Sequence, residues 1–150
     1  TSRQQVAAQE SFVGVRVRDL MLPDPPTAGP DLPVQRFISE YVLQRGLRAL
    51  PVVVGGRVVG VVSITDVKEV PAERWGALAI GEIMTNDKLA SVRPSDELAP
   101  ALRLLAERDL NQLLVMDEGQ LLGLLSRSSI IRYLQLRQEL GASDLVRGRR

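Results

Sequence analysis

Two hydroxyl groups and a carboxylate stand close together in Gly60-Val61-Val62-Ser63-Ile64-Thr65-Asp66, where an apolar run ends. If a strand meets a helix here, free N–H groups and the positive end of the helix dipole favour an anion such as phosphate. Ser63 and Thr65 can donate hydrogen bonds to that anion, and Asp66 can accept two from vicinal hydroxyls such as those of a ribose. A nucleotide would satisfy all three side chains.

The same segment also fits a simpler interpretation. Thr65 or Asp66 can cap the start of a helix when no ligand is bound. Gly55 and Gly60 have the spacing of a phosphate-binding P-loop, but Val61 stands where that motif requires lysine. We reject the P-loop, and both nucleotide binding and plain capping fit the segment.

Composition excludes several classes of protein. The 150 residues are 45% hydrophobic and 25% charged, with a formal net charge of +1, which argues against disorder and against a broad field for nucleic acid or anionic lipid. The chain has no cysteine and no histidine, which removes disulfides, thiol nucleophiles, histidine triads and nearly all zinc or haem sites. We therefore expect a non-catalytic, globular chain with no metal and no nucleic-acid partner.

No apolar run is long enough to cross a bilayer, since the longest, from Leu50 to Ile64, is interrupted by Gly55-Gly56-Arg57. We expect no direct membrane insertion and a cytoplasmic location. The sequence starts at Thr1 without an initiator methionine or a signal segment, so we expect it to be a fragment of a longer protein.

The chain contains an internal repeat. Val17-Arg18-Asp19-Leu20-Met21 matches Ile80-Gly81-Glu82-Ile83-Met84, 63 residues later. The same offset holds for four later pairs, namely Pro51 with Leu114, Gly60 with Gly123, Ser63 with Ser126 and Asp66 with Ser129, whereas Pro30 matches Pro94 with one extra residue. The spacing predicts a duplicated unit of about sixty residues.

Each copy has the same predicted order of elements. Apolar spacing from Val34 and from Leu98 predicts amphipathic helices, which we expect to start at Pro30-Asp31 and Pro94-Ser95, with Gly46 ending the first. Strands are predicted at Leu50–Val54 and Arg57–Ser63, joined by a Gly55-Gly56 hairpin, and at Leu113–Met116 and Gln120–Ser126, joined by a turn at Asp117-Glu118-Gly119. A short helix follows from Thr65, and a longer one runs from Ser128 to about Leu140, ended by Gly141.

These elements predict an α+β fold of two helix-strand-strand-helix repeats related by a pseudo-twofold axis, because a repeat of this size would be marginally stable alone. Trp75, in the connector between the copies, is expected to cover an apolar seam. We divide the chain into a lead-in segment 1–12, a first domain 13–70, a linker 71–79, a second domain 80–140 and a flexible tail 141–150.

Over roughly residues 13–140 the chain resembles a tandem pair of CBS domains, the Bateman module. The resemblance rests on the duplication together with two motifs in each copy. They are Leu50-Pro51-Val52-Val53 and Gly60-Val61-Val62-Ser63-Ile64-Thr65-Asp66, then Leu113-Leu114-Val115 and Gly123-Leu124-Leu125-Ser126-Arg127-Ser128-Ser129. It implies an α/β-type CBS fold and a regulatory module that binds adenine nucleotides in clefts between paired sheets.

The resemblance also implies site residues. In the family, the strand entrance holds adenine, the junction aspartate binds ribose, and nearby hydroxyls and basic groups meet phosphate. The first site would use Thr27, Arg48, Ala49, Leu50, Ser63, Thr65 and Asp66, and the second would use Ser91, Asn111, Gln112, Leu113, Ser126 and Arg127.

The second copy departs from the family pattern, because Ser129 replaces the ribose-binding aspartate and Leu114 replaces the proline. A hydrogen bond to a charged group is worth roughly 1.5–3 kcal/mol, so its loss weakens a nucleotide on the order of ten- to a hundredfold. We therefore expect the first site to be the stronger.

A finer resemblance concerns the parent protein. Val70-Pro71-Ala72-Glu73-Arg74-Trp75, Glu107-Arg108-Asp109-Leu110-Asn111-Gln112 and Arg132-Tyr133-Leu134 are similar to the C-terminal CBS pair of bacterial site-2-protease-family intramembrane zinc metalloproteases. This implies a regulatory part attached to an effector domain, with any zinc in the parent enzyme.

The expected function is a sensor that binds AMP, ADP or ATP and controls that effector as a homodimer. Ile130, Ile131 and Leu134 are candidates for the dimer contact or for the core of one chain. The alternative is a dimerisation or scaffold module with no small ligand, and a stand-alone enzyme has little support.

Overall fold

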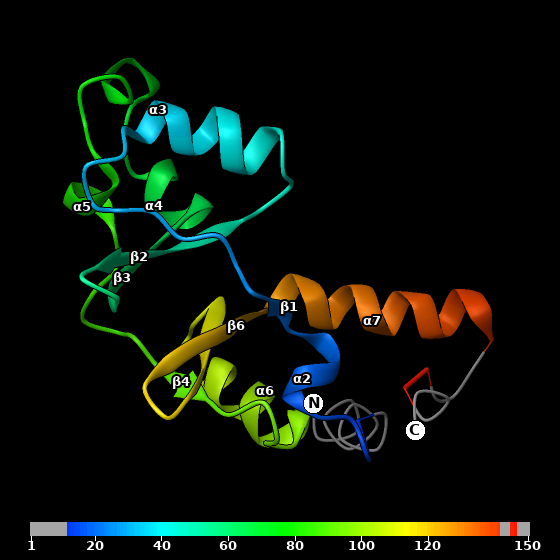
Figure 1. Cartoon of the computed structure of the whole chain (residues 1–150). Helices are drawn as coiled ribbons and strands as arrows, with labels where there is room; N and C mark the ends of the chain where they lie inside the picture. Colours follow the sequence, from blue (N-terminus) through cyan, green and yellow to red (C-terminus); the bar gives the residue numbers. More distant parts are fainter. Residues whose placement is uncertain (1–11, 142–144, 147–150) are drawn as a thin grey trace. The chain divides into compact units, whose positions relative to one another are not determined.

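The computed structural model describes residues 12–141 and 145–146 (Figure 1). Most of the expected lead-in segment and tail lies outside these residues. The chain divides into two compact units, Pro25–Leu89 and a second made of the residues up to Asp24 together with those from Ala90 onward. We call them the first-repeat unit and the second-repeat unit. Each combines most of one repeat with the leading segment of the other.

The first-repeat unit is built on a hairpin. Strands β2 (Ala49–Val54) and β3 (Arg57–Ser63) are antiparallel. Gly55 and Gly56 join them with φ angles of 56° and 79°, which confirms the predicted turn. Ala28 pairs in parallel with Val52 on one side, and Thr85 pairs antiparallel with Val61 on the other. The hairpin thereby becomes the centre of a four-stranded pattern.

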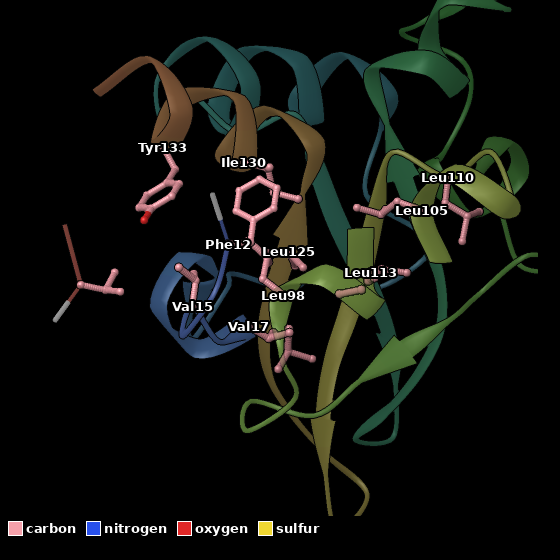
Figure 2. Packing of buried hydrophobic residues seen from close by; sticks show 13 residues of the cluster. Phe12, Val15, Val17, Leu98, Leu105, Leu110, Leu113, Leu125, Ile130 and Tyr133 are labelled. Carbon is pink, nitrogen blue, oxygen red and sulfur yellow. The ribbon is translucent and has the colours of Figure 1, made fainter. Parts of the chain in front are cut away.

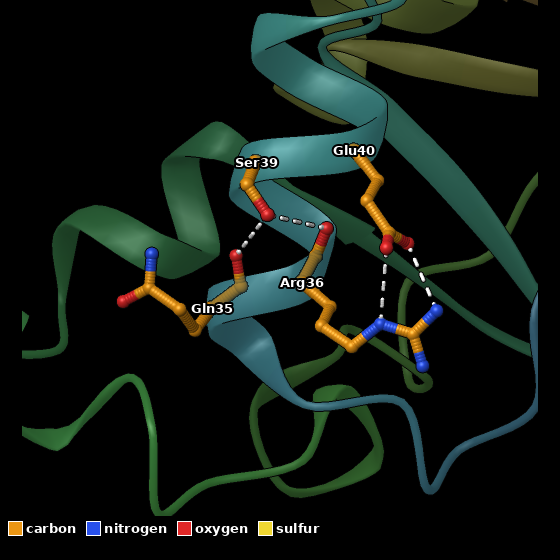
Figure 3. Close-up of polar contacts among 4 residues, drawn as sticks. All are labelled: Gln35, Arg36, Ser39 and Glu40. Carbon is orange, nitrogen blue, oxygen red and sulfur yellow. Dashed lines mark hydrogen bonds and ion pairs between the residues drawn. The ribbon is translucent and has the colours of Figure 1, made fainter.

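The helices of this unit are short. Helix α3 (Val34–Arg36) continues into the π-helix η1 (Phe37–Leu43), and later come α4 (Ile64–Lys68), the 3-10 turn η2 (Ala72–Arg74) and α5 (Ile80–Ile83). Figure 3 shows the outer face of the α3–η1 segment, where Arg36 donates to both carboxylate oxygens of Glu40, at 3.2 and 3.1 Å. Arg36 is largely exposed and Glu40 is partly exposed, so this ion pair adds little stability.

The predicted helix starts were wrong. Helices α3 and α6 (Leu98–Glu107) begin at Val34 and Leu98, later than Pro30-Asp31 and Pro94-Ser95. The preceding residues are held by the leading segment of the other repeat. The Pro30 carbonyl accepts a hydrogen bond from Gly81 N–H at 2.9 Å, and the Pro94 carbonyl accepts one from Arg18 N–H at 3.0 Å. The two contacts are equivalent in the two repeats, because Gly81 lies 63 residues after Arg18 and Pro94 lies 64 residues after Pro30.

The second-repeat unit has the same arrangement, with hairpin strands of the same length and a longer final helix. Its sheet runs in the order β1 (Leu22–Pro23), β6 (Gln120–Ser126), β5 (Gln112–Asp117) and β4 (Ser91–Val92), and only β4 and β5 are parallel. Helices α2 (Val17–Leu20), α6 and α7 (Arg127–Leu140) complete it. Helix α7 ends at Gly141, whose φ of 63° confirms the predicted stop.

Each unit has its own hydrophobic core. Figure 2 shows that of the second-repeat unit, where Val17, Leu98, Leu105, Leu113 and Leu125 are fully buried. The core of the first-repeat unit contains Val34, Phe37, Leu50, Val52, Val62, Val67 and Ile80. Trp75 packs against the core of the first-repeat unit, and its indole N–H donates to the Val70 carbonyl at 3.2 Å. This agrees with the expectation that Trp75 covers an apolar surface. The mixture of helices and sheets confirms the α+β prediction.

Candidate nucleotide site

The first predicted site begins where β2 starts and β3 ends. Ala49 lies opposite Ser63 in the strand register, and Leu50 lies opposite Val62. Ile64 N–H donates to the Arg48 carbonyl at 3.0 Å, which closes this end of the hairpin. The structure therefore brings the strand entrance, residues 48–50, beside the strand-to-helix junction, residues 63–66.

Thr27 reaches the same sheet from the other side of β2. Its neighbour Ala28 donates to the Pro51 carbonyl at 3.2 Å and accepts from Val53 N–H at 2.9 Å. Thr27 itself is exposed. All seven residues predicted for the first site thus belong to the sheet of the first-repeat unit and its junction.

The Asp66 carboxylate accepts three hydrogen bonds at this junction. Its Oδ2 accepts from Ser63 N–H at 2.9 Å and from Ser63 Oγ at 3.1 Å, while its Oδ1 accepts from Thr85 Oγ1 at 2.9 Å. Asp66 N–H in turn donates to Ser63 Oγ at 3.3 Å, which completes a capping box. Capping is therefore present, but the N-cap is Ser63 rather than Thr65 or Asp66, and Asp66 takes part as the third residue of the helix.

Capping leaves the carboxylate with limited acceptor capacity. A carboxylate offers about four lone-pair positions, and three are used here. The remaining position lies on Oδ1, because Oδ2 already accepts two hydrogen bonds. A ribose hydroxyl can therefore bind at Oδ1 without displacing a protein donor, whereas a second one at Oδ2 requires the Ser63 hydroxyl to turn away.

The phosphate-binding part of the expectation needs correction. The N–H groups of Ile64 and Asp66 already donate to acceptors within the chain, so they are not free to bind a phosphate. Helix α4 has only five residues, so its dipole is short. Arg48 supplies a positive charge next to the junction. It is exposed, and among the described residues no side chain pairs with its guanidinium.

The second predicted site shares the backbone arrangement. Gln112 lies opposite Ser126, Leu113 lies opposite Leu125, and Ser91 of β4 lies beside Leu114. Arg127 N–H donates to the Asn111 carbonyl at 2.9 Å, as Ile64 does to Arg48. The backbone groups of all six predicted residues are therefore brought to the corresponding end of this sheet.

The side chains of the second junction differ. Ser126 Oγ lies 2.9 Å from the hydroxyl oxygens of both Ser128 and Ser129, so an uncharged hydroxyl cluster stands where the first junction has a carboxylate. The Arg127 guanidinium, predicted to meet phosphate, donates instead to the carbonyls of Leu110 and Leu105, at 2.5 and 2.9 Å. In this structure Arg127 satisfies carbonyls at and beyond the end of α6.

Thr85 was missed by the sequence analysis. It follows Met84 in the matched leading segments, where Leu22 follows Met21, so the alignment did signal a polar residue replacing an apolar one. Its contact with Asp66 spans 19 residues of sequence, and no local motif predicts it.

Two further properties bear on function. Within residues 12–141 and 145–146, no helix combines the length and the hydrophobicity needed to span a bilayer. In the same part of the chain, no three acidic side chains gather as ligands for a metal ion.

Comparison with known proteins gives matches over most of the chain. A Synechocystis protein named as a zinc metalloprotease is 26% identical over 139 residues, which are 90% of this chain and 37% of that protein. A Mycobacterium tuberculosis protein named as the zinc metalloprotease Rip3 is 27% identical over 135 residues, 88% of this chain and 34% of that protein. The chain thus spans only about a third of the length of these curated relatives.

Among solved structures, CBSX2 in complex with AMP is 31% identical and superposes with a TM-score of 0.63, covering 83% of this chain and 99% of that one. A family model described as CBS domain matches this chain twice, at residues 17–73 and 80–136. The chain therefore belongs to the CBS-domain family, as a tandem pair with the fold of a Bateman module.

Proposed function

We propose that this chain is a regulatory module that binds an adenine nucleotide at the β3–α4 junction of the first-repeat unit. The observation that carries the proposal is the position of the Asp66 carboxylate beside the β2 entrance, fixed by the pairing of Ala49 with Ser63 and of Ile64 with Arg48. The AMP complex of CBSX2, a relative of similar length, supports this class of ligand.

Each group at the junction has a role in the proposal. The backbone of Ala49 and Leu50 faces the adenine edge, and Asp66 Oδ1 accepts a ribose hydroxyl. The exposed Arg48 guanidinium neutralises phosphate, which a planar guanidinium binds well. Ser63 holds the carboxylate, and Thr27 lies on the neighbouring segment.

The proposed parent is a membrane metalloprotease, because the curated relatives are named as zinc metalloproteases and are much longer than this chain. The chain itself contributes no catalytic group, and zinc chemistry belongs to the rest of the parent. Control of the parent requires that the nucleotide bind two arrangements of the module with different affinities. A module of this kind on the cytoplasmic side of the membrane would report adenine-nucleotide levels to the protease.

Titration calorimetry with AMP, ADP and ATP tests the proposal. We expect saturable heat with at least one nucleotide, and a ten- to hundredfold loss of affinity in Asp66→Asn, on the order of 1.5–3 kcal/mol for a hydrogen bond to a charged group. Ser129→Ala, at the aligned position of the other repeat, is the matched control and retains affinity. Silence for all three nucleotides would contradict the proposal.

A ligand-free dimerisation module is the second candidate, favoured by apolar side chains on α7. Ile131, Leu136 and Leu140 are 54%, 41% and 66% exposed, whereas Ile130 is buried in the core of its own unit. Sedimentation analysis of Ile131→Asp separates the two candidates. A dimer that dissociates in this variant, in a protein that binds no nucleotide, favours the scaffold.

A further inference from the structure

Thr85 is held firmly against the last strand of the first-repeat unit. Its N–H donates to the Val61 carbonyl and its carbonyl accepts from Val61 N–H, each at 2.9 Å. This two-way pairing fixes the Thr85 backbone on β3, five residues before Asp66 in the direction of the chain. Its hydroxyl then donates to Asp66 Oδ1 at 2.9 Å.

The hydrogen bond from Thr85 reaches the only carboxylate oxygen that Ser63 does not hold. Ser63 fixes Oδ2 through its N–H and its hydroxyl. Thr85 holds Oδ1 through one hydrogen bond, which leaves one lone-pair position of that oxygen open. Hydrogen bonds to both of its oxygens therefore fix the orientation of the Asp66 carboxylate.

The second-repeat unit lacks both members of this pair. Leu22 pairs with Leu124 in β6, the position that corresponds to Thr85 on Val61 in β3. Ser129 stands where Asp66 stands in the other copy, and it bonds to Ser126 rather than to the leading segment. The carboxylate and the hydroxyl that orients it are thus replaced together, by a neutral residue and an apolar one.

We propose that Thr85 is a positioning residue that makes the first junction selective for a ribose over a deoxyribose. This inference rests on the proposed function and deepens it. Thr85 holds Asp66 so that the open position on Oδ1 faces the sugar hydroxyl, and the absence of the same pair from the second-repeat unit restricts sugar recognition to one junction in each chain.

The test compares Thr85→Val, which keeps the side-chain shape without the hydroxyl, with Thr85→Ser, which keeps the hydroxyl. Calorimetry with AMP, 2′-deoxy-AMP and 3′-deoxy-AMP should show AMP binding about tenfold weaker in Thr85→Val, the loss expected for one hydrogen bond to a charged group. Its preference for AMP over the deoxy nucleotides should shrink, and Thr85→Ser should restore both. Equal weakening for all three nucleotides, or no weakening at all, would overturn the inference.

Thermal unfolding without ligand separates this inference from the proposed function. If Thr85 contacts Asp66, Thr85→Val lowers the Tm of the wild-type chain but lowers that of Asp66→Ser much less. Equal shifts in both backgrounds would overturn the contact, whatever the nucleotide result. If the cycle shows coupling while the wild type binds no nucleotide, the contact stands and the sugar-recognition role fails with the proposed function.

A gain-of-function variant tests the pairing directly. We expect Leu22→Thr combined with Ser129→Asp to bind AMP at a second site, raising the calorimetric stoichiometry from one to two per chain. Ser129→Asp alone should bind the second AMP more weakly, because nothing orients its carboxylate. Equal affinity in the single and double variants would contradict a positioning role for the threonine.

Discussion

Gly60 of β3 leaves space for Met84 of the other repeat. A Cβ at Gly60 would lie 2.5 Å from Met84 Sδ and 3.1 Å from the Thr85 carbonyl oxygen. Gly123 of β6 has the same relation to Met21, also with 2.5 Å to the sulfur. Both units therefore have a glycine where the leading segment of the other repeat crosses their last strand.

This close approach predicts that Gly60→Ala destabilises the fold. Overpacking costs about 1–3 kcal/mol of unfolding free energy, and the Thr85 backbone is held on Val61 by two hydrogen bonds, one through its N–H and one through its carbonyl. Urea denaturation measures the change, and Gly123→Ala should behave alike. Gly76→Ala, where a Cβ would meet nothing within 4 Å, is the control. If Gly60→Ala matches this control, the methionine side chain moves aside without cost.

Leu50 and Leu113 hold equivalent places in the two cores, and both are fully buried. We expect Leu50→Ala and Leu113→Ala each to lower the free energy of unfolding by about 2–5 kcal/mol, through lost burial and an unfilled cavity. Leu43→Ala, at a side chain that is 75% exposed, should change it by less than about 0.5 kcal/mol. A small effect at either core position would show that its cluster does not support the unit.

Arg127 is expected to stabilise the second-repeat unit rather than to bind phosphate. Arg127→Met removes the donors to the Leu105 and Leu110 carbonyls and should cost about 1–3 kcal/mol of unfolding free energy. Arg93→Met removes an exposed pair with Asp117 at 3.8 Å and should cost less than about 1 kcal/mol. Unchanged stability in Arg127→Met, together with weaker nucleotide binding, would return the residue to its predicted role.

Local sequence patterns predicted the hairpins well. The strands Arg57–Ser63 and Gln120–Ser126 have the predicted bounds, Ala49–Val54 starts one residue earlier than predicted, and Gln112–Asp117 is one residue longer at each end. Turn glycines and short apolar runs are local signals, and both correspond to hairpin turns and buried strand segments in the structure. Gly141 likewise stops α7 because its left-handed conformation is a property of a single residue.

Features that depend on the other repeat could not be predicted. The segment from Pro30 to Pro33 looks like a helix start, but it pairs with the segment around Ala79 and Gly81 instead. The Thr85 hydrogen bond to Asp66 likewise joins the two repeats, whereas the guanidinium contacts of Arg127 join distant segments of one repeat. Each joins residues 17 or more positions apart, which no local period encodes.

The most direct test of a nucleotide site at the first junction is amide chemical-shift mapping of the isotopically labelled chain during AMP titration. The account predicts that the largest shifts fall at residues 48–50 and 63–66, with smaller ones at residues 111–113 and 126–129. Shifts confined to the second set, or none at saturating AMP, would contradict it.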